Sequence, residues 1–131
     1  MDTRRPWRLV ILALLSVGLF LNLDRCQDQY IERPLTTIAI DSVAISENQC
    51  LLRVKAQTPD ACWKFARFEV DRKDGEVLIR IIGRREKEAL CAQVIGTVEA
   101  EVPVEIPHPG KYRFRFMDAT EVALDTTVVI P

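Results

Sequence analysis

The sequence of 131 residues has one histidine and five scattered glycines, and it lacks the short motifs that many enzymes depend on. It has no glycine-rich loop of the kind that cradles phosphates. Its four cysteines include no C-x-x-C redox pair, and with one histidine they do not supply four zinc ligands at motif spacing. These absences argue against nucleotide-binding, thiol-redox and zinc chemistry, and we expect no metal and no other cofactor.

Strong charge of either sign is also missing. The net charge is −1, and acidic and basic residues interleave without a basic stripe or an acidic tail. The densest cluster, Gly83 to Glu88, mixes both signs between two apolar segments, which is typical of a solvated turn. Nucleic-acid-binding domains usually carry a basic face. We therefore expect no nucleic-acid partner, and nothing in the sequence indicates a small-molecule ligand.

What the chain does have is an uninterrupted apolar run from Leu9 to Leu23, preceded by Arg4, Arg5 and Arg8. A basic flank before such a run predicts an export or anchoring signal and not a part of a globular core. A helix starting at Trp7 would span roughly 25 Å, slightly less than a hydrocarbon core of about 30 Å. Because the arginines come first, the bulk of the chain should lie outside the cytoplasm.

Three fates of this segment remain open: cleavage, lipidation and retention. Residues 22–25 lack the small side chains that cleavage requires. Leu23 and Cys26 have the separation of a lipoprotein signal, but Asp24 and Arg25 break the pattern, so lipidation of Cys26 stays an alternative. We expect residues 1–25 to be a retained signal-anchor and transmembrane helix, residues 26–35 a polar tether, and residues 36–131 one exported domain.

The exported part is dominated by apolar residues that alternate with polar ones, the period of a β-strand. Residues 98–106 alternate most cleanly, and the glutamates and proline on their wet face indicate a guarded edge strand. A bulge near Phe65 and a hairpin turn at Asp74-Gly75 are also expected. The pattern predicts an all-β, immunoglobulin-like antiparallel sandwich of about seven strands, with a small barrel as the alternative. Strands are expected within residues 38–45, 50–56, 62–70, 77–82, 89–95, 98–106, 112–116 and 122–130.

The cysteines should be interpreted for an oxidising compartment, where pairing is the default. Cys26, Cys50, Cys62 and Cys91 allow three full connectivities, and the sequence alone does not choose among them. Cys62 and Cys91 each follow a turn, and a bridge closing that loop would stabilise the fold by roughly 3 kcal/mol. Cys50 is interpreted as a buried thiol. Cys26 would be free to carry lipid, to pair between chains or to stay unmodified.

Two motifs and a closing strand carry a resemblance. The motifs are Pro59-Asp60-Ala61-Cys62 and Ala89-Leu90-Cys91-Ala92, and the strand opens with Gly110-Lys111-Tyr112. In these respects the chain resembles small uncharacterised bacterial envelope proteins and lipoproteins, although Met117-Asp118 replaces the Asn-Gly expected in the last hairpin. The resemblance implies an immunoglobulin-like sandwich with a Cys62–Cys91 disulfide, a location in the bacterial cell envelope, and no activity.

The function is predicted from this expected cellular location and from the fold. We expect no enzyme, but a membrane-anchored protein-interaction or structural module with an unknown protein partner. An inhibitor- or chaperone-like module is the alternative, acting by strand addition or through a rigid loop made of Pro107, His108, Pro109, Gly110 and Lys111. A thiol-dependent enzyme with a Cys50–His108 pair is a third hypothesis, and it would require an exposed thiolate beside a cation.

Overall fold

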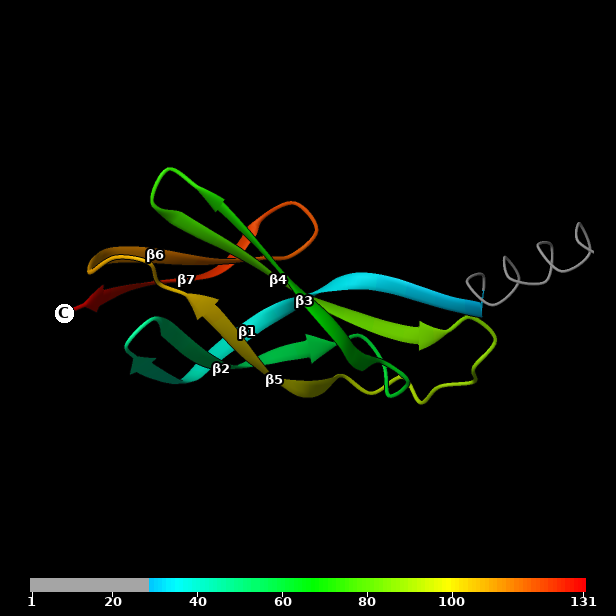
Figure 1. Cartoon of the computed structure of the whole chain (residues 1–131). Coiled ribbons are helices and arrows are strands. Elements are labelled where there is room, and N and C mark those ends of the chain that lie inside the picture. Colours follow the sequence, from blue (N-terminus) through cyan, green and yellow to red (C-terminus); the bar gives the residue numbers. More distant parts are fainter. Residues whose placement is uncertain (1–28) are drawn as a thin grey trace, which may run out of the picture.

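Seven strands account for most of residues 29–131, the part of the chain that the computed structural model describes (Figure 1). The predicted all-β sandwich is therefore confirmed. The expected signal-anchor helix over residues 1–25, and Cys26 after it, lie outside the described residues. Within residues 29–131 the structure has no helix with the length and apolarity to cross a membrane. The strands are β1 (Tyr30–Ser46), β2 (Gln49–Thr58), β3 (Lys64–Lys73), β4 (Glu76–Glu86), β5 (Gly96–Glu105), β6 (Gly110–Met117) and β7 (Val122–Ile130).

The long strand β1 belongs to both layers of the sandwich. Its first part, Tyr30 to Leu35, pairs with β4, and from Thr36 to Ser46 it pairs with β2. One layer contains β3, β4, β6, β7 and the start of β1, while the other contains β5, β2 and the rest of β1. Strand β4 pairs with β3 along one edge and with both β1 and β6 along the other. The pairing of β4 with β6 is parallel, a departure from the expected antiparallel arrangement.

The core lies between the inward faces of the two layers. Alternation places the apolar residues of each strand on that face, so the glutamates of β5 remain exposed while the residues between them are buried. Strand β5 ends its layer, which confirms the predicted edge position. The largest fully buried apolar side chains of this core are Cys50, Leu52, Val54, Val77, Ile79, Ile81, Val102, Val104, Phe114 and Phe116.

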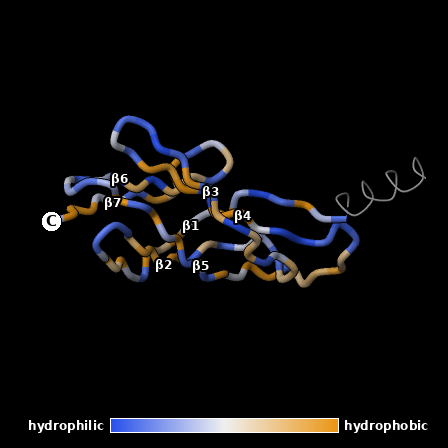
Figure 2. Tube along the Cα trace, in the orientation of Figure 1, coloured by the Kyte–Doolittle hydropathy of each residue, from blue (hydrophilic) through white to orange (hydrophobic). Residues whose placement is uncertain are grey.

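The predicted turn chemistry is also present. Asp74 and Gly75 have φ angles of 49° and 77°, so the hairpin between β3 and β4 closes through two residues in the left-handed region. This tip is hydrophilic in Figure 2. The register of β3 against β4 shifts between Phe65 and Arg67, where the mixed parity of the sequence predicted a bulge.

The predicted tether over residues 26–35 is wrong from Tyr30 onward. Strand β1 begins at Tyr30, and Pro34 and Leu35 pair with Ile82 and Ile81 of β4. A proline is compatible with a strand where its missing N–H is not required by a neighbour. The polar sequence of this stretch concealed a pairing that depends on a distant strand.

The strand expected over residues 89–95 is absent, and the connection between β4 and β5 is irregular there. Leu90, Val94 and Ile95 are largely exposed, so these apolar residues are not buried between the two layers. In Figure 2 this connection changes from hydrophilic to hydrophobic colouring along its course. Without a neighbouring strand, an apolar stretch has no ladder to join.

Candidate interaction surfaces

The end of the domain where β1 begins is held by a disulfide between Cys62 and Cys91, whose Cα atoms are 5.6 Å apart. The pairing implied by the family resemblance is therefore confirmed. Cys62 lies in the turn before β3, and Cys91 lies in the irregular connection between β4 and β5. We call the segment from Lys87 to Ile95 the disulfide loop. The bridge fixes this loop against a segment that precedes it by 29 residues.

Asp60 is the second fastening of the disulfide loop. Its Oδ1 accepts a hydrogen bond from the Cys62 backbone N–H at 2.9 Å, and its Oδ2 accepts one from Arg85 at 2.7 Å. Arg85 also donates to the carbonyl of Ala89 at 3.0 Å. Only 5% of Asp60 is exposed. The aspartate of the P-D-x-C motif thus positions the disulfide turn, a role that the sequence analysis did not assign to it.

Backbone hydrogen bonds tie the disulfide loop to both neighbouring segments. The Ala61 N–H donates to the carbonyl of Ala92 at 3.2 Å, and the Lys87 N–H donates to the carbonyl of Gln29 at 2.9 Å. The second bond places the loop directly beside the first described residue of the chain. In Figure 1 this loop and the start of β1 lie together at one end of the domain.

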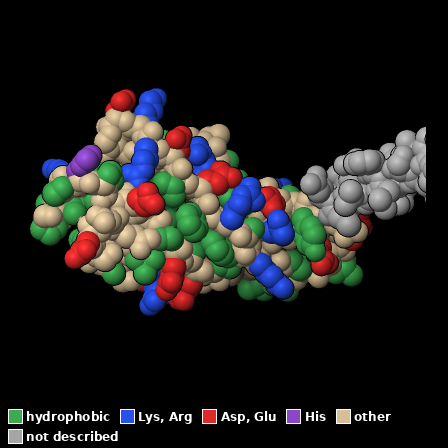
Figure 3. Space-filling view, viewed as in Figure 1, with side chains coloured by type: hydrophobic (Ala, Val, Ile, Leu, Met, Phe, Trp, Pro, Cys, Tyr) green, Lys and Arg blue, Asp and Glu red, His purple; other side chains and the backbone are tan. Residues whose placement is uncertain are grey.

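The disulfide loop presents apolar side chains to solvent. Leu90 is 101% exposed, Ile95 67% and Val94 61%. Figure 3 shows hydrophobic side chains intermixed with basic and acidic ones at this end of the domain. Because the loop is fixed covalently and by hydrogen bonds, these side chains project from a held backbone.

One cluster near the disulfide has the composition of a metal site. Ligand atoms of Asp60, Cys62 and Cys91 lie within 4.8 Å of one another. Both sulfurs are committed to the disulfide, and thiolates are the species that bind metal ions. In the oxidised protein this cluster therefore has a structural role.

Glu32 links three strands on the outside of the same half of the domain. Arg67 of β3 and Arg84 of β4 both donate to its carboxylate, Arg84 through Nη2 at 2.6 Å. The hydrogen bonds from Arg67 and then from Arg84 hold the pKa of Glu32 below its usual range. The Arg84 guanidinium also lies over the Tyr30 ring, 5.1 Å from its centroid.

The opposite end carries the loop that the sequence analysis singled out, Pro107 to Lys111. Tyr112 donates from its hydroxyl to the His108 carbonyl at 2.7 Å, and the Ile106 N–H donates to the Asn48 carbonyl at 2.9 Å. His108 itself is exposed. The loop is thus braced on both sides.

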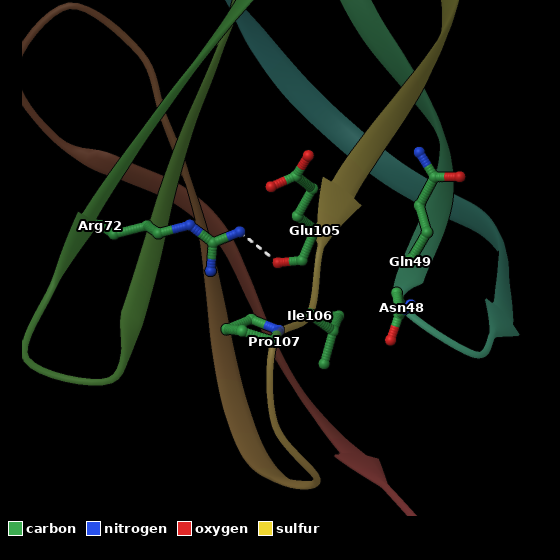
Figure 4. Close-up of a pocket in the computed structure, with 6 residues that line it drawn as sticks. All are labelled: Asn48, Gln49, Arg72, Glu105, Ile106 and Pro107. Carbon is green, nitrogen blue, oxygen red and sulfur yellow. Dashed lines mark hydrogen bonds between the residues drawn. The ribbon is translucent and has the colours of Figure 1, made fainter.

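A hollow of about 420 Å³ lies beside this loop. Figure 4 shows Arg72 reaching across from the β3–β4 hairpin to donate to the Glu105 backbone carbonyl, with Asn48 and Gln49 on the far side. The residues that line the hollow include no histidine, and its one arginine donates to a backbone carbonyl. It has the character of a surface depression between hairpins.

Cys50 does not approach the arrangement that a catalytic thiol needs. Its side chain is fully buried, and burial raises the pKa of its thiol. His108 lies in an exposed loop, so the structure does not unite the two residues of the hypothetical nucleophile pair. Cys50 is a core thiol, as predicted.

A surface that the sequence analysis missed lies along the second half of β1. Val43 and Ile45 stand directly opposite Leu52 and Cys50 in the β1–β2 ladder, so they share the inward face of the sheet with these two core residues. Leu52 and Cys50 are fully buried, yet Val43 is 39% exposed and Ile45 46%. The opposing layer therefore stops short of β1. We call Val43 and Ile45 the open inner edge.

Alternation alone could not reveal the open inner edge. The period of two assigns Val43 and Ile45 to the core face, but whether a second layer covers that face depends on where β1 sits in its sheet. In the two rows nearest the turn between β1 and β2, the β5 and β2 members are buried and only the β1 member is exposed: these rows are Val104, Cys50, Ile45 and Val102, Leu52, Val43. The surface is thus a consequence of sheet order.

Comparison with known proteins identifies the domain. The family model described as the ORF11 beta-sandwich domain matches residues 52–128, more than half of the chain, and the chain belongs to this family. The match covers most of β2 and extends into β7, and it does not include β1. No curated protein and no solved structure matches significantly.

Proposed function

We propose that this member of the ORF11 beta-sandwich family is a membrane-anchored domain of the bacterial cell envelope, held outside the cytoplasm, which binds an extended segment of a protein partner at its open inner edge. The observation that carries the binding proposal is the exposure of Val43 and Ile45 on a face whose neighbouring residues are completely buried. An apolar inward face left without cover is an incomplete core.

The backbone of β1 supports the same proposal. From Thr36 to Ser46, β2 is the one described strand that pairs with β1. The edge of β1 opposite β2 is therefore free of described strands along this stretch. A partner strand added there would satisfy the free backbone groups and place alternate side chains over Val43 and Ile45. Backbone pairing would supply affinity, and the apolar side chains would supply selectivity.

The proposed address rests on two features of the chain. The arginine-flanked apolar run from Leu9 to Leu23 has the pattern of an anchor that leaves the following residues outside. The Cys62–Cys91 disulfide fits the same compartment, because disulfides persist in oxidising surroundings and are rare in the cytosol.

A reporter fused after Pro131 tests the address. Alkaline phosphatase, which is active only outside the cytoplasm, should be active in this fusion, and a cytoplasmic fluorescent reporter should remain dark. The reverse pattern would place the domain inside the cell and end the proposal.

Photo-crosslinking of the full chain in its native membrane tests the partner surface. A photo-reactive residue in place of Ile45 should form an adduct with another protein, and an extended apolar peptide added in excess should suppress that adduct. The same residue in place of Glu99, on the exposed face of β5, is the matched control and should give no suppressible adduct. Equal labelling at both positions, or none at position 45, would contradict binding at the open inner edge.

The braced loop from Pro107 to Lys111 supports a second candidate, an inhibitor-like role in which His108 projects into a partner. The hydrogen bonds from Tyr112 and to Asn48 give the loop the rigidity that such a role needs. A photo-reactive residue in place of His108 separates the candidates. A peptide-insensitive adduct at position 108, with none at position 45, would favour the loop.

A further inference from the structure

The disulfide loop is an apolar surface with a defined position relative to the start of the domain. Leu90, Val94 and Ile95 are each more than half exposed, although the loop that carries them is fixed by a disulfide and by the Asp60–Arg85 pair. A disulfide and a partly buried ion pair therefore hold three exposed apolar side chains in a fixed arrangement, which is suited to contact with another apolar surface.

The chain outside the described residues limits the answer. The apolar run ends at Leu23, and only the residues from Asp24 to Asp28 separate it from Gln29. Such a segment reaches roughly 20 Å at full extension. The carbonyl of Gln29 accepts the hydrogen bond from Lys87, at the base of the disulfide loop. If the run is an anchor, this end of the domain lies within that reach of the bilayer.

We propose that the disulfide loop inserts Leu90, Val94 and Ile95 into the membrane interface and so fixes the orientation of the domain on the bilayer. The inference rests on the membrane anchoring proposed above. Apolar side chains on a rigid loop enter the boundary between headgroups and acyl chains without an ordering cost. The exposed Lys87 at the start of the loop would meet lipid phosphates, and the exposed Glu88 beside it would remain on the aqueous side.

This contact would point the rest of the domain away from the membrane. The open inner edge lies toward the turn between β1 and β2, at the end of β1 remote from Gln29. Figure 1 shows these two ends at opposite extremes of the domain. Two attachments, the anchor and the loop, would hold the partner surface outward, whereas a single tether would leave it free to rotate.

The test is photo-crosslinking to lipid, with the full chain reconstituted into vesicles of phosphatidylcholine and phosphatidylglycerol. A photo-reactive residue in place of Leu90 should give lipid adducts detectable by mass. The matched control is the same residue in place of Val129, which is 66% exposed on β7 at the far end, and it should give none. A further variant, Val94→Glu with Ile95→Glu, should lose the adducts at position 90 and keep its place in the membrane.

Flotation of the same vesicles separates the possible failures. If the chain floats with the lipid and position 90 yields no lipid adduct, or only an adduct with a second copy of the chain, the loop inference is overturned while anchoring stands. If the chain does not float, anchoring fails and the loop inference fails with it. Lipid adducts at position 90 alone, in floating vesicles, support both.

Discussion

The two ends of the sandwich reverse the chain in different ways. At the far end, β3 returns into β4 through Asp74 and Gly75, and the ladder continues on both sides of the turn. At the near end, β4 returns to β5 through the disulfide loop, which has no ladder and is held by a disulfide, an ion pair and separate backbone hydrogen bonds. The residues of a tight turn are enough to stabilise it, whereas an irregular loop is stabilised by a disulfide, an ion pair or hydrogen bonds to other parts of the fold.

The two ends should therefore contribute unequally to the free energy of unfolding. Substitutions that remove a fastening of the disulfide loop should destabilise the fold more than comparable substitutions among the tight turns. The following experiments test that asymmetry.

The largest effect is expected from removing the disulfide. Replacing Cys62 and Cys91 together by alanine should lower the free energy of unfolding by about 3.5 kcal/mol, because the unfolded chain regains the entropy of the closed loop. Denaturant unfolding measures the loss, and reduction of the parent protein should reproduce it. A loss below about 1 kcal/mol would mean that the other fastenings suffice, far from the chain-entropy expectation.

Asp60→Ala should cost about 2–3 kcal/mol, because it leaves Arg85 partly buried without its carboxylate and frees the Cys62 N–H. The matched control at the far end is Asp125→Ala. It removes the exposed pair with Arg113, which is joined at 2.8 Å, and should cost much less than Asp60→Ala because solvent screens the pair. Thermal unfolding of both variants gives the comparison, and equal losses would remove the asymmetry.

Two glycines sharpen the contrast further. A Cβ at Gly83 would lie 2.8 Å from side-chain carbons of Leu35, so Gly83→Ala should displace this buried side chain and cost about 1–3 kcal/mol. A Cβ at Gly75 meets nothing within 4 Å, and only the left-handed φ is strained, so Gly75→Ala should cost roughly 1 kcal/mol. Denaturant midpoints should rank the pair in this order. The opposite ranking would show that the Leu35 side chain repacks at little cost.

The smallest effect is a dependence on acidity near the disulfide end. The pKa of Glu32 is lowered in the folded protein, so its contribution to stability is complete above the ordinary glutamate pKa of about 4.3 and is lost as pH falls through the lower folded value. Glu32→Gln should flatten that part of the profile of melting temperature against pH. A profile unchanged by the substitution would show that Arg67 and Arg84 do not stabilise the carboxylate measurably.

Local patterns predicted much of the fold because each depended on neighbours in sequence. The alternation of β5, the turn at Asp74-Gly75 and the bulge near Phe65 each depend on a few adjacent residues, and the structure contains all three. The Cys62–Cys91 bridge was implied by the resemblance and is present. The role of Asp60 escaped prediction because Asp60 lies in a turn and its partner, Arg85, lies on β4, 25 residues further along the chain.

The errors share one physical cause: pairing across the sheet. Tyr30 to Pro34 looked like a tether because the partner strand β4 is distant in sequence, and residues 89–95 looked like a strand because apolar content does not guarantee a neighbour. The exposure of Ile45 likewise follows from the order of strands. A sequence period assigns a side chain to a face, while the sheet order decides whether that face is covered.

The continuity of β1 has a mechanical consequence. This one strand of 17 residues, roughly 55 Å long at about 3.3 Å per residue, runs from the entry of the chain at Tyr30 to Ser46, beside the proposed partner surface. If the domain is anchored and binds a partner as proposed, tension between the membrane and that partner would travel along the covalent backbone of β1. The ladders with β4 and β2 would be loaded lengthwise, so many hydrogen bonds would share the force instead of opening one after another.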